Sequence, residues 1–259
     1  MHLTNKSAAR ASALFLLFSG TFAQAAIVYE TGVSNPWSST SNDTAMNSAF
    51  GTGKWVKSNG FNLGLFTDAT MVYLDGSHLG ANAMHSFIEK NQTSLESYVA
   101  KGGHLFINAA PNEGGSFSMG FGVTLNYSNT YSSIATITAA GVAAGLSKGG
   151  IATTYGGFAF SHATVTGPIS NLVQGAKGNI FGAMDYGSGF VAFGGQTLPV
   201  FHTPENDSRR LLVNQLIFVN DAEVENLAVI AAVPEPQTYA MLLAGLGGMG
   251  FVARRRKPL

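Results

Sequence analysis

The chain has 259 residues, with 14 lysines and arginines, 14 aspartates and glutamates, and no cysteine. Without cysteine the protein has no disulfide, no zinc–thiolate site and no cysteine nucleophile. Residues 27–233 hold 8 basic and 13 acidic side chains, a net charge of −5 with neutral histidines. This balance argues against nucleic acid as a partner, because phosphate neutralisation needs clustered lysines and arginines.

The N-terminus has the three parts of a secretory signal peptide. Lys6 and Arg10 give a basic segment, residues 11–23 are an apolar run around "ALFLLF", and Ala23-Gln24-Ala25 is an A-x-A cleavage site. We therefore expect residues 1–25 to form a signal helix that signal peptidase removes on export across the inner membrane. The chain that remains is long enough for one domain, predicted at residues 26–221, with a linker at residues 222–232.

The first half of this domain has the pattern of parallel strands joined by a helix. Ile27–Glu30 and Thr70–Gly76 are apolar, β-rich runs of the kind that is buried on both faces of a sheet. Gly80–Ala100 places its apolar residues at helical spacing and ends at a glycine pair, and His104–Pro111 is another buried strand. A strand, a helix and a second strand make a βαβ unit with parallel pairing.

The second half is richer in glycine and in short strands. Asn179–Gly195 predicts an antiparallel hairpin that turns between Tyr186 and Gly189, and Asn206–Phe218 predicts a closing amphipathic helix. We expect an α/β domain of three layers with a mainly parallel central sheet. The alternative is a β-sandwich, which the glycine- and threonine-rich second half favours.

Four segments resemble the class I glutamine-amidotransferase-like fold, the flavodoxin-like layout shared with ThuA-type proteins. They read "TMVYLDGS", "YVAKGGHLFINAAP", "GFVAFGGQTLPVFHTPEN" and "RRLLVNQLIF". The resemblance implies a cysteine nucleophile on the turn after "LFINAAP", where this chain has Ala110, Pro111 and Asn112. His202 and Glu205 resemble the family's base pair, but their H-x-x-E spacing is one residue longer. We therefore expect no amidotransferase, and a protein that is not an enzyme.

A ligand site is expected at the carboxyl ends of the strands, where open α/β sheets bind ligands. Carboxylates and histidines there could hold a metal or transfer protons, or they could be loop groups that cap helices and turns. We predict no metal and no cofactor. The residues of this possible ligand face are Asp75, His78, Asn112, Glu113, His202 and Glu205.

Three aromatic residues and one further histidine have two interpretations. Trp37, Trp55 and Tyr186 would form a sugar-stacking platform if they shared a face, and otherwise they serve packing. His162, in "FSHATV", is expected to satisfy backbone groups at the end of a strand, and a ligand role is the alternative.

The C-terminal segment begins with Val233, Pro234, Glu235 and Pro236 and ends in a basic cluster that contains Arg254, Arg255 and Arg256. Between them Tyr239–Ala253 has no charge, and as a helix it would cover about 22 Å, short of the roughly 30 Å of a bilayer core. A G-x-G-x-x-G pattern inside this run does not predict a nucleotide site, since no acidic residue follows it. A short apolar span with a basic end fits a transient membrane helix.

These three ordered parts, over residues 233–259, resemble the PEP-CTERM sorting signal. The resemblance implies recognition by exosortase, a membrane protease-transpeptidase, and then release or transfer to the cell surface or extracellular matrix. We expect a secreted, non-enzymatic surface or matrix protein that binds exopolysaccharide. The alternatives are a metal-dependent or acid–base hydrolase that uses Asp75, His78, Glu113 and His202, and a purely structural matrix component.

Overall fold

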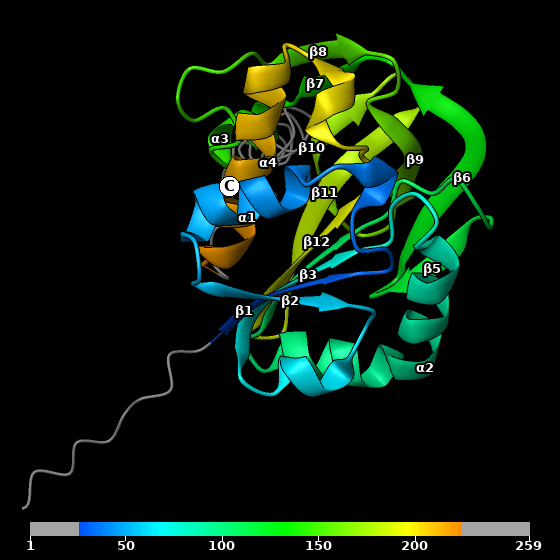
Figure 1. The fold of residues 1–259 in the computed structure, drawn as a ribbon, viewed down its shortest axis with the longest axis vertical. Helices are drawn as coiled ribbons and strands as arrows, with labels where there is room; N and C mark the ends of the chain where they lie inside the picture. Colours follow the sequence, from blue (N-terminus) through cyan, green and yellow to red (C-terminus); the bar gives the residue numbers. More distant parts are fainter. Residues whose placement is uncertain (1–25, 224–259) are drawn as a thin grey trace, which may run out of the picture.

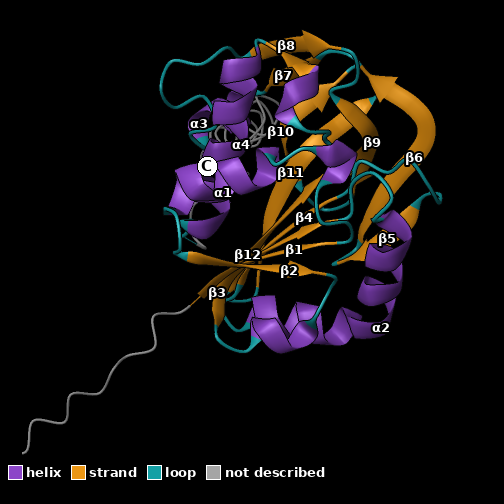
Figure 2. Cartoon of the chain, viewed as in Figure 1, coloured by secondary structure: helices purple, strands orange, loops and turns teal. Residues whose placement is uncertain are grey.

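A computed structural model describes residues 26–223, apart from the side chains of residues 128–131. Strands are the commonest regular structure in this part of the chain, and ten of them form the main sheet, in the order β13-β8-β7-β10-β11-β12-β4-β3-β1-β2. Figures 1 and 2 show how the strands and helices are arranged. The predicted signal helix and the predicted membrane helix at residues 239–253 lie outside the described residues. Among the helices of residues 26–223, none is long and apolar enough to cross a membrane.

One half of the main sheet is parallel. It joins the five strands β1 (Ala26–Thr31), β2 (Trp55–Asn59), β3 (Ala69–Asp75), β4 (His104–Asn108) and β12 (Gly189–Gly194). The prediction that Thr70–Gly76 and His104–Pro111 are neighbouring parallel strands is confirmed, with Met71 opposite His104 and Asp75 opposite Asn108. Helix α2 (Ala81–Ala100) connects them. It begins one residue after the predicted start, Gly80, and ends at the predicted residue.

The other half of the main sheet is antiparallel. Its strands are β7 (Ala135–Ile137), β8 (Thr154–Gly157), β10 (Ser170–Gly175), β11 (Gly178–Tyr186) and β13 (His202–Thr203). The predicted hairpin is confirmed, because β11 and β12 are antiparallel and Tyr186 pairs with Gly189. Strand β12 therefore joins the two halves, with β4 parallel on one side and β11 antiparallel on the other.

The expected three-layer flavodoxin-like fold with a mainly parallel sheet is wrong. Beyond the mixed sheet, β5 (Phe117–Gly120), β6 (Val123–Ser132) and β9 (Ser161–Thr166) form a second, antiparallel sheet. A parallel crossover needs a helix-sized connection, but the only α-helix between β4 and β12 is the five-residue α3 (Ala139–Ala143). The chain between these two neighbouring strands therefore folds into antiparallel strands.

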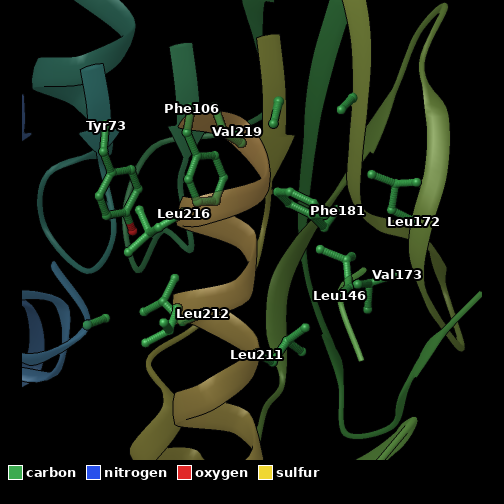
Figure 3. Packing of buried hydrophobic residues seen from close by; sticks show 14 of the residues in the cluster. Tyr73, Phe106, Leu146, Leu172, Val173, Phe181, Leu211, Leu212, Leu216 and Val219 are labelled. Carbon is green, nitrogen blue, oxygen red and sulfur yellow. The ribbon is translucent and has the colours of Figure 1, made fainter. Parts of the chain in front are cut away.

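Two apolar cores lie on the two faces of the main sheet. On one face α1 (Ser41–Phe50) and α4 (Glu205–Asn220) pack together, and Leu212 and Leu216 of α4 lie beside Tyr73 and Phe106 (Figure 3). On the other face α2 and the second sheet pack against Val72, Leu105 and Val191. The β-sandwich alternative anticipates the many strands of the second half, but helices cover much of both faces.

An aromatic stack crosses the parallel strands under α4. Tyr29 on β1 stacks on Tyr73 on β3 with ring centroids 5.0 Å apart, and Tyr73 stacks on Phe106 on β4 at 4.8 Å. Phe181 on β11 meets the edge of Phe106 at 5.3 Å and 81°. Offset stacks and edge contacts of this kind add to the stabilisation that comes from burial alone. The stack fixes the strands whose carboxyl ends carry the candidate site.

Candidate functional site

Buried polar side chains lie at the carboxyl ends of the parallel strands, in the region of the predicted ligand face. Asp75 ends β3 and is fully buried, with its Oδ2 accepting from Asn42 Nδ2 at 2.7 Å. Its Oδ1 accepts from the backbone N of Ser77 at 3.0 Å and from Asn108 Nδ2 at 3.5 Å. Burial raises the pKa of the Asp75 carboxyl, while the hydrogen bonds from Ser77, Asn108 and Asn42 act to lower it.

Asn108 links the ends of three strands. Its Nδ2 donates to the backbone O of Gln196 at 3.0 Å and to Ser77 Oγ at 3.3 Å, and its Oδ1 accepts from the backbone N of Gln196 at 3.1 Å. Sequence reasoning did not select Asn42, Ser77 or Asn108. The signal for Asn108 is a polar residue directly after the apolar "HLFI" of a buried strand. These residues hold Asp75 within the fold, out of contact with solvent.

Trp37, which follows β1, is the centre of an aromatic cluster on this face. Its ring lies 5.3 Å from His78, 5.7 Å from His162 and 5.6 Å from Phe201, measured between ring centroids. We call Trp37, His78, His162 and Phe201 the Trp37 cluster. The four residues come from four different segments of the chain, so the fold alone brings them together.

The backbone is strained at the same place. Trp37, Ser38 and His78 have φ angles of 49°, 56° and 59°, in the left-handed region that side-chain-bearing residues rarely adopt. Such conformations cost of the order of 1–3 kcal/mol each and concentrate at binding and catalytic sites. Within the described residues only one other non-glycine residue, Phe121, has a positive φ. Three of these four positions therefore belong to the cluster or adjoin it.

Hydrogen bonds fix both histidines of the Trp37 cluster. His78 Nδ1 lies 3.0 Å from Asn112 Nδ2, so that this ring nitrogen accepts, and His162 Nδ1 lies 3.0 Å from the backbone O of Pro111. The pKa of His162 is lowered by burial and, to a smaller degree, by the neighbouring His78, while its bond to Pro111 acts in the opposite direction. The backbone bond is the role predicted for His162, and its ring also faces Trp37.

The other residues of the predicted ligand face have separate partners. Glu113 Oε1 accepts from the backbone N of Asn82 at 3.2 Å, in the first turn of α2, and Glu205 pairs with Arg209 one turn along α4. His202 is buried against Phe160, with ring centroids 4.0 Å apart, and its Nε2 lies 2.9 Å from Thr197 Oγ1. Burial lowers the pKa of His202 to about 3.

Of the six predicted residues, the structure brings His78 and Asn112 into contact, whereas Asp75 is held in a separate hydrogen-bond network. Across residues 26–223 no group of three or more histidines, aspartates and glutamates is arranged to hold a metal ion.

The three aromatic residues considered for a sugar-stacking platform do not share a face. Trp55 starts β2 and donates to Asn47 Oδ1 at 3.0 Å, and Tyr186 pairs with Gly189 at the start of β12. Both lie at the amino-terminal end of the parallel strands, whereas Trp37 follows the carboxyl end of β1. Phe201 and two exposed apolar residues near the Trp37 cluster were not selected from the sequence. These two are Leu79, next to His78 and 54% exposed, and Phe158, 84% exposed, whose backbone N donates to the O of Phe201 at 3.3 Å.

Comparison with known families confirms the resemblance seen at the C-terminus. Residues 232–257 match the PEP-CTERM protein-sorting motif. The motif implies that the protein is exported, anchored in the membrane for sorting and processed by exosortase. It lies outside the described residues, so its geometry is not part of the candidate site.

Comparison of whole chains gives distant similarities only. No curated protein sequence matches this chain. Among solved structures it is similar to the β-galactosidase of Rahnella sp. R3, at 10% identity and a TM-score of 0.43, over 73% of this chain and 30% of that one. It is also similar to a protein of Thermoplasma acidophilum that is assigned to GMP synthase, at 10% identity and a TM-score of 0.44, over 73% of this chain and 92% of that one.

A third similarity is to a cytoplasmic protein of Salmonella typhimurium, at 12% identity and a TM-score of 0.46, over 75% of this chain and 98% of that one. The chain thus spans about 30% of the length of the β-galactosidases that it resembles. Likenesses of this size establish neither a family nor an activity.

Proposed function

We propose that this protein is a non-enzymatic surface or matrix protein that binds extracellular polysaccharide through the Trp37 cluster. The observation that carries the proposal is the half-buried ring of Trp37, held on a left-handed backbone among His78, His162 and Phe201. Strained backbone persists only where the surrounding structure enforces it, and it is concentrated at sites of function.

The chemistry of the cluster suits a sugar ligand. An aromatic ring offers an apolar face to the C–H groups of a sugar ring, and neighbouring amide and imidazole groups can hydrogen-bond its hydroxyls. Asn112 is exposed beside His78. The lowered pKa of His162 favours the uncharged imidazole, whose single N–H donates from Nδ1 to the backbone O of Pro111, so Nε2 can act only as an acceptor. Leu79, next to His78 in the chain, and Phe158, whose backbone N donates to Phe201, add exposed apolar surface near the cluster.

The residues of the same face support a role without catalysis. The chain has no cysteine, so it lacks the nucleophile that the resemblance to the class I glutamine-amidotransferase-like family implies after Ala110 and Pro111. The rival hydrolase would need Asp75, His78, Glu113 and His202 to act on one substrate. Asp75 and His202 are buried, and Glu113 is bound at the start of α2, which supports the binding role.

Sorting supports the same role. A protein that exosortase processes is delivered beyond the inner membrane, and the surface and matrix are where extracellular polysaccharide accumulates. A structural matrix component without a ligand is the second candidate, and a binding experiment separates the two.

Tryptophan fluorescence tests the proposal directly, because the chain has two tryptophans. In Trp55→Phe the emission comes from Trp37 alone, and we expect extracellular polysaccharide from the producing cells to shift its wavelength and intensity. Trp37→Ala should weaken binding at least tenfold, because the stacking surface is removed. Trp55→Ala, at the opposite end of the sheet, is the matched control and should bind like wild type.

An unchanged affinity in Trp37→Ala would exclude the Trp37 cluster as the site. Binding by none of the variants, across a panel of neutral and acidic glycans, would favour the purely structural role. Hydrolysis of any glycan in the panel, abolished by Asp75→Asn, would favour the hydrolase.

A further inference from the structure

A cavity lies between α1 and the N-terminal part of α4, and it has no role in the site described above. It has a volume of about 330 Å³. It is lined by the apolar residues Ala45, Pro199 and Val213 and by the polar residues Ser41, Thr44, Ser48, Asn206, Arg209 and Arg210. The volume is at the lower end of the range for small-molecule sites. We call it the α1–α4 cleft.

The distribution of arginine singles out this cleft. Arg209 and Arg210 are the only arginines between residues 11 and 253, and both line it. The other six cations of residues 27–233 are lysines, none of which lines the cleft. Arginine presents a planar fork of donors that matches a carboxylate, which lysine does not. In a domain of net negative charge, two adjacent arginines in one cavity indicate an anionic ligand.

The two arginines differ in their freedom to bind. Arg209 pairs with Glu205, but both side chains are more than a third exposed, so the pair contributes little and a ligand carboxylate can compete for it. Arg210 has no carboxylate partner within residues 26–223. Among the described residues that line the cleft, none is acidic. The guanidinium of Arg210, unpaired among the described residues, therefore gives the cleft a positive charge that suits one anionic group.

The hydroxyls of α1 supply the complementary polarity. Thr44 Oγ1 donates to the backbone O of Thr40 at 3.1 Å, and Ser48 Oγ donates to the backbone O of Thr44 at 2.8 Å. Since their hydrogens are used within the helix, these two oxygens face a ligand as acceptors. The cleft thus offers donors at the arginines and acceptors at the hydroxyls. That combination matches a sugar acid, whose carboxylate accepts and whose hydroxyls donate.

The cleft and the Trp37 cluster are connected through the short turn Pro199–Phe201. Pro199 lines the cleft, and Phe201, two residues later, contacts the ring of Trp37. Ser208 Oγ on α4 donates to the backbone O of Pro199 at 2.9 Å and holds this turn against the helix. The turn Pro199–Phe201 therefore adjoins both the cleft and the Trp37 cluster.

We propose that the α1–α4 cleft binds a carboxylate-bearing sugar unit, so that the protein selects acidic over neutral polysaccharide. The inference rests on the proposed function for the polymer, but the ligand of the cleft is argued from the residues that line it. Arg210 would hold the carboxylate, Arg209 would assist it, and Thr44 and Ser48 would accept from the sugar hydroxyls.

The test compares D-galacturonate with D-galactose, which differ by a carboxylate in place of a hydroxymethyl group, by calorimetry on the exported protein. We expect galacturonate to bind at least tenfold more tightly than galactose. Arg210→Gln should weaken the binding of galacturonate at least tenfold and leave the binding of galactose unchanged. Arg209→Gln should weaken the binding of galacturonate by less. Lys148→Gln removes a nearby cation that does not line the cleft, and it should behave as wild type.

Three outcomes would overturn the inference: equal affinity for the two sugars, no effect of Arg210→Gln, or inorganic phosphate binding as tightly as galacturonate. The two proposals fail separately. If Trp37→Ala abolishes polysaccharide binding while Arg210→Gln binds galacturonate normally, the Trp37 site stands and the cleft does not. If Arg210→Gln loses galacturonate while Trp37→Ala retains the polysaccharide, the cleft stands and the Trp37 site does not.

Discussion

Two buried titratable side chains give the domain opposing responses to pH. Burial raises the pKa of Glu30 on β1 to about 7, although its Oε2 accepts from the backbone N of Asn62 at 3.0 Å. Its Oε1 has no hydrogen-bond partner among the described residues. Burial lowers the pKa of His202 to about 3. The folded state therefore favours a protonated glutamate and a neutral histidine.

The sign of each effect follows from comparing the folded with the unfolded chain. Glu30 holds its proton more tightly when folded, so its contribution is fully present below about pH 4.5 and is lost as the pH rises through about 7. His202 resists protonation when folded, so its contribution is present above about pH 6.5 and is lost progressively as the pH falls towards 3.

We predict that Glu30→Gln removes the loss of stability between pH 4.5 and 7. The shift from 4.5 to about 7 corresponds to roughly 3 kcal/mol, so the variant should gain stability of that order on wild type as the pH rises. Urea denaturation at several pH values measures it, and the difference between the two proteins cancels the contribution of His202. Glu89→Gln, exposed on α2, is the control. A constant difference across this range would contradict the prediction.

At the scale of elements, the junction between α2 and the β11–β12 hairpin depends on close backbone approach. Ser188 N donates to the backbone O of Ala100 at 3.0 Å, which ties the hairpin turn to the end of α2. A Cβ at Gly189 would lie 2.1 Å from the backbone O of Val99 and 2.3 Å from that of Gly103. The start of β12 thus fits against this corner only without a side chain.

We predict that Gly189→Ala destabilises the domain by about 1–3 kcal/mol, because the backbone on both sides must move. Gly156→Ala is the matched control, since it also lies in a strand and its Cβ would meet nothing within 4 Å. The control should be neutral or slightly stabilising. Thermal denaturation of both variants measures the effect, and equal stabilities would refute the steric argument.

Several elements could be predicted from the sequence because their signals are local. The apolar runs of β3 and β4, the apolar face of α2, the hairpin turn at Tyr186–Gly189 and the apolar face of α4 all lie within short windows. The second sheet could not be predicted in this way. Val165 on β9 pairs with Leu125 on β6, forty residues earlier, and no short window records that pairing.

The candidate site, too, could be predicted only where its signals are local in the sequence. Polar residues after buried strands predicted the region of Asp75, His78 and Asn112. The contact of Trp37 with Phe201 depends on a turn far along the chain, and the left-handed backbone at Trp37 and Ser38 has no sequence signal. Both features were therefore beyond prediction from the sequence.

At the scale of the whole molecule, the signal peptide and the sorting motif predict which terminal residues are removed from the mature protein. We predict that exported protein lacks both residues 1–25 and the C-terminal "RRRKPL", as intact mass spectrometry would detect. Glu235→Ala, inside the motif, should retain that C-terminus and accumulate in the membrane fraction. Glu223→Ala, outside the motif, is the control. Extracellular protein with an intact "RRRKPL" would contradict exosortase processing.

The position of β12 in the sheet has a consequence for folding. Eighty residues separate the end of β4 from the start of β12, its neighbour in the sheet. During export β4 emerges before these residues and β12 do, and until β12 pairs with it β4 is an open edge strand. Such an edge is a template for pairing with other chains. Closing so long a loop is slow compared with forming local contacts. The interval between the appearance of β4 and of β12 is therefore when this protein is most exposed to aggregation.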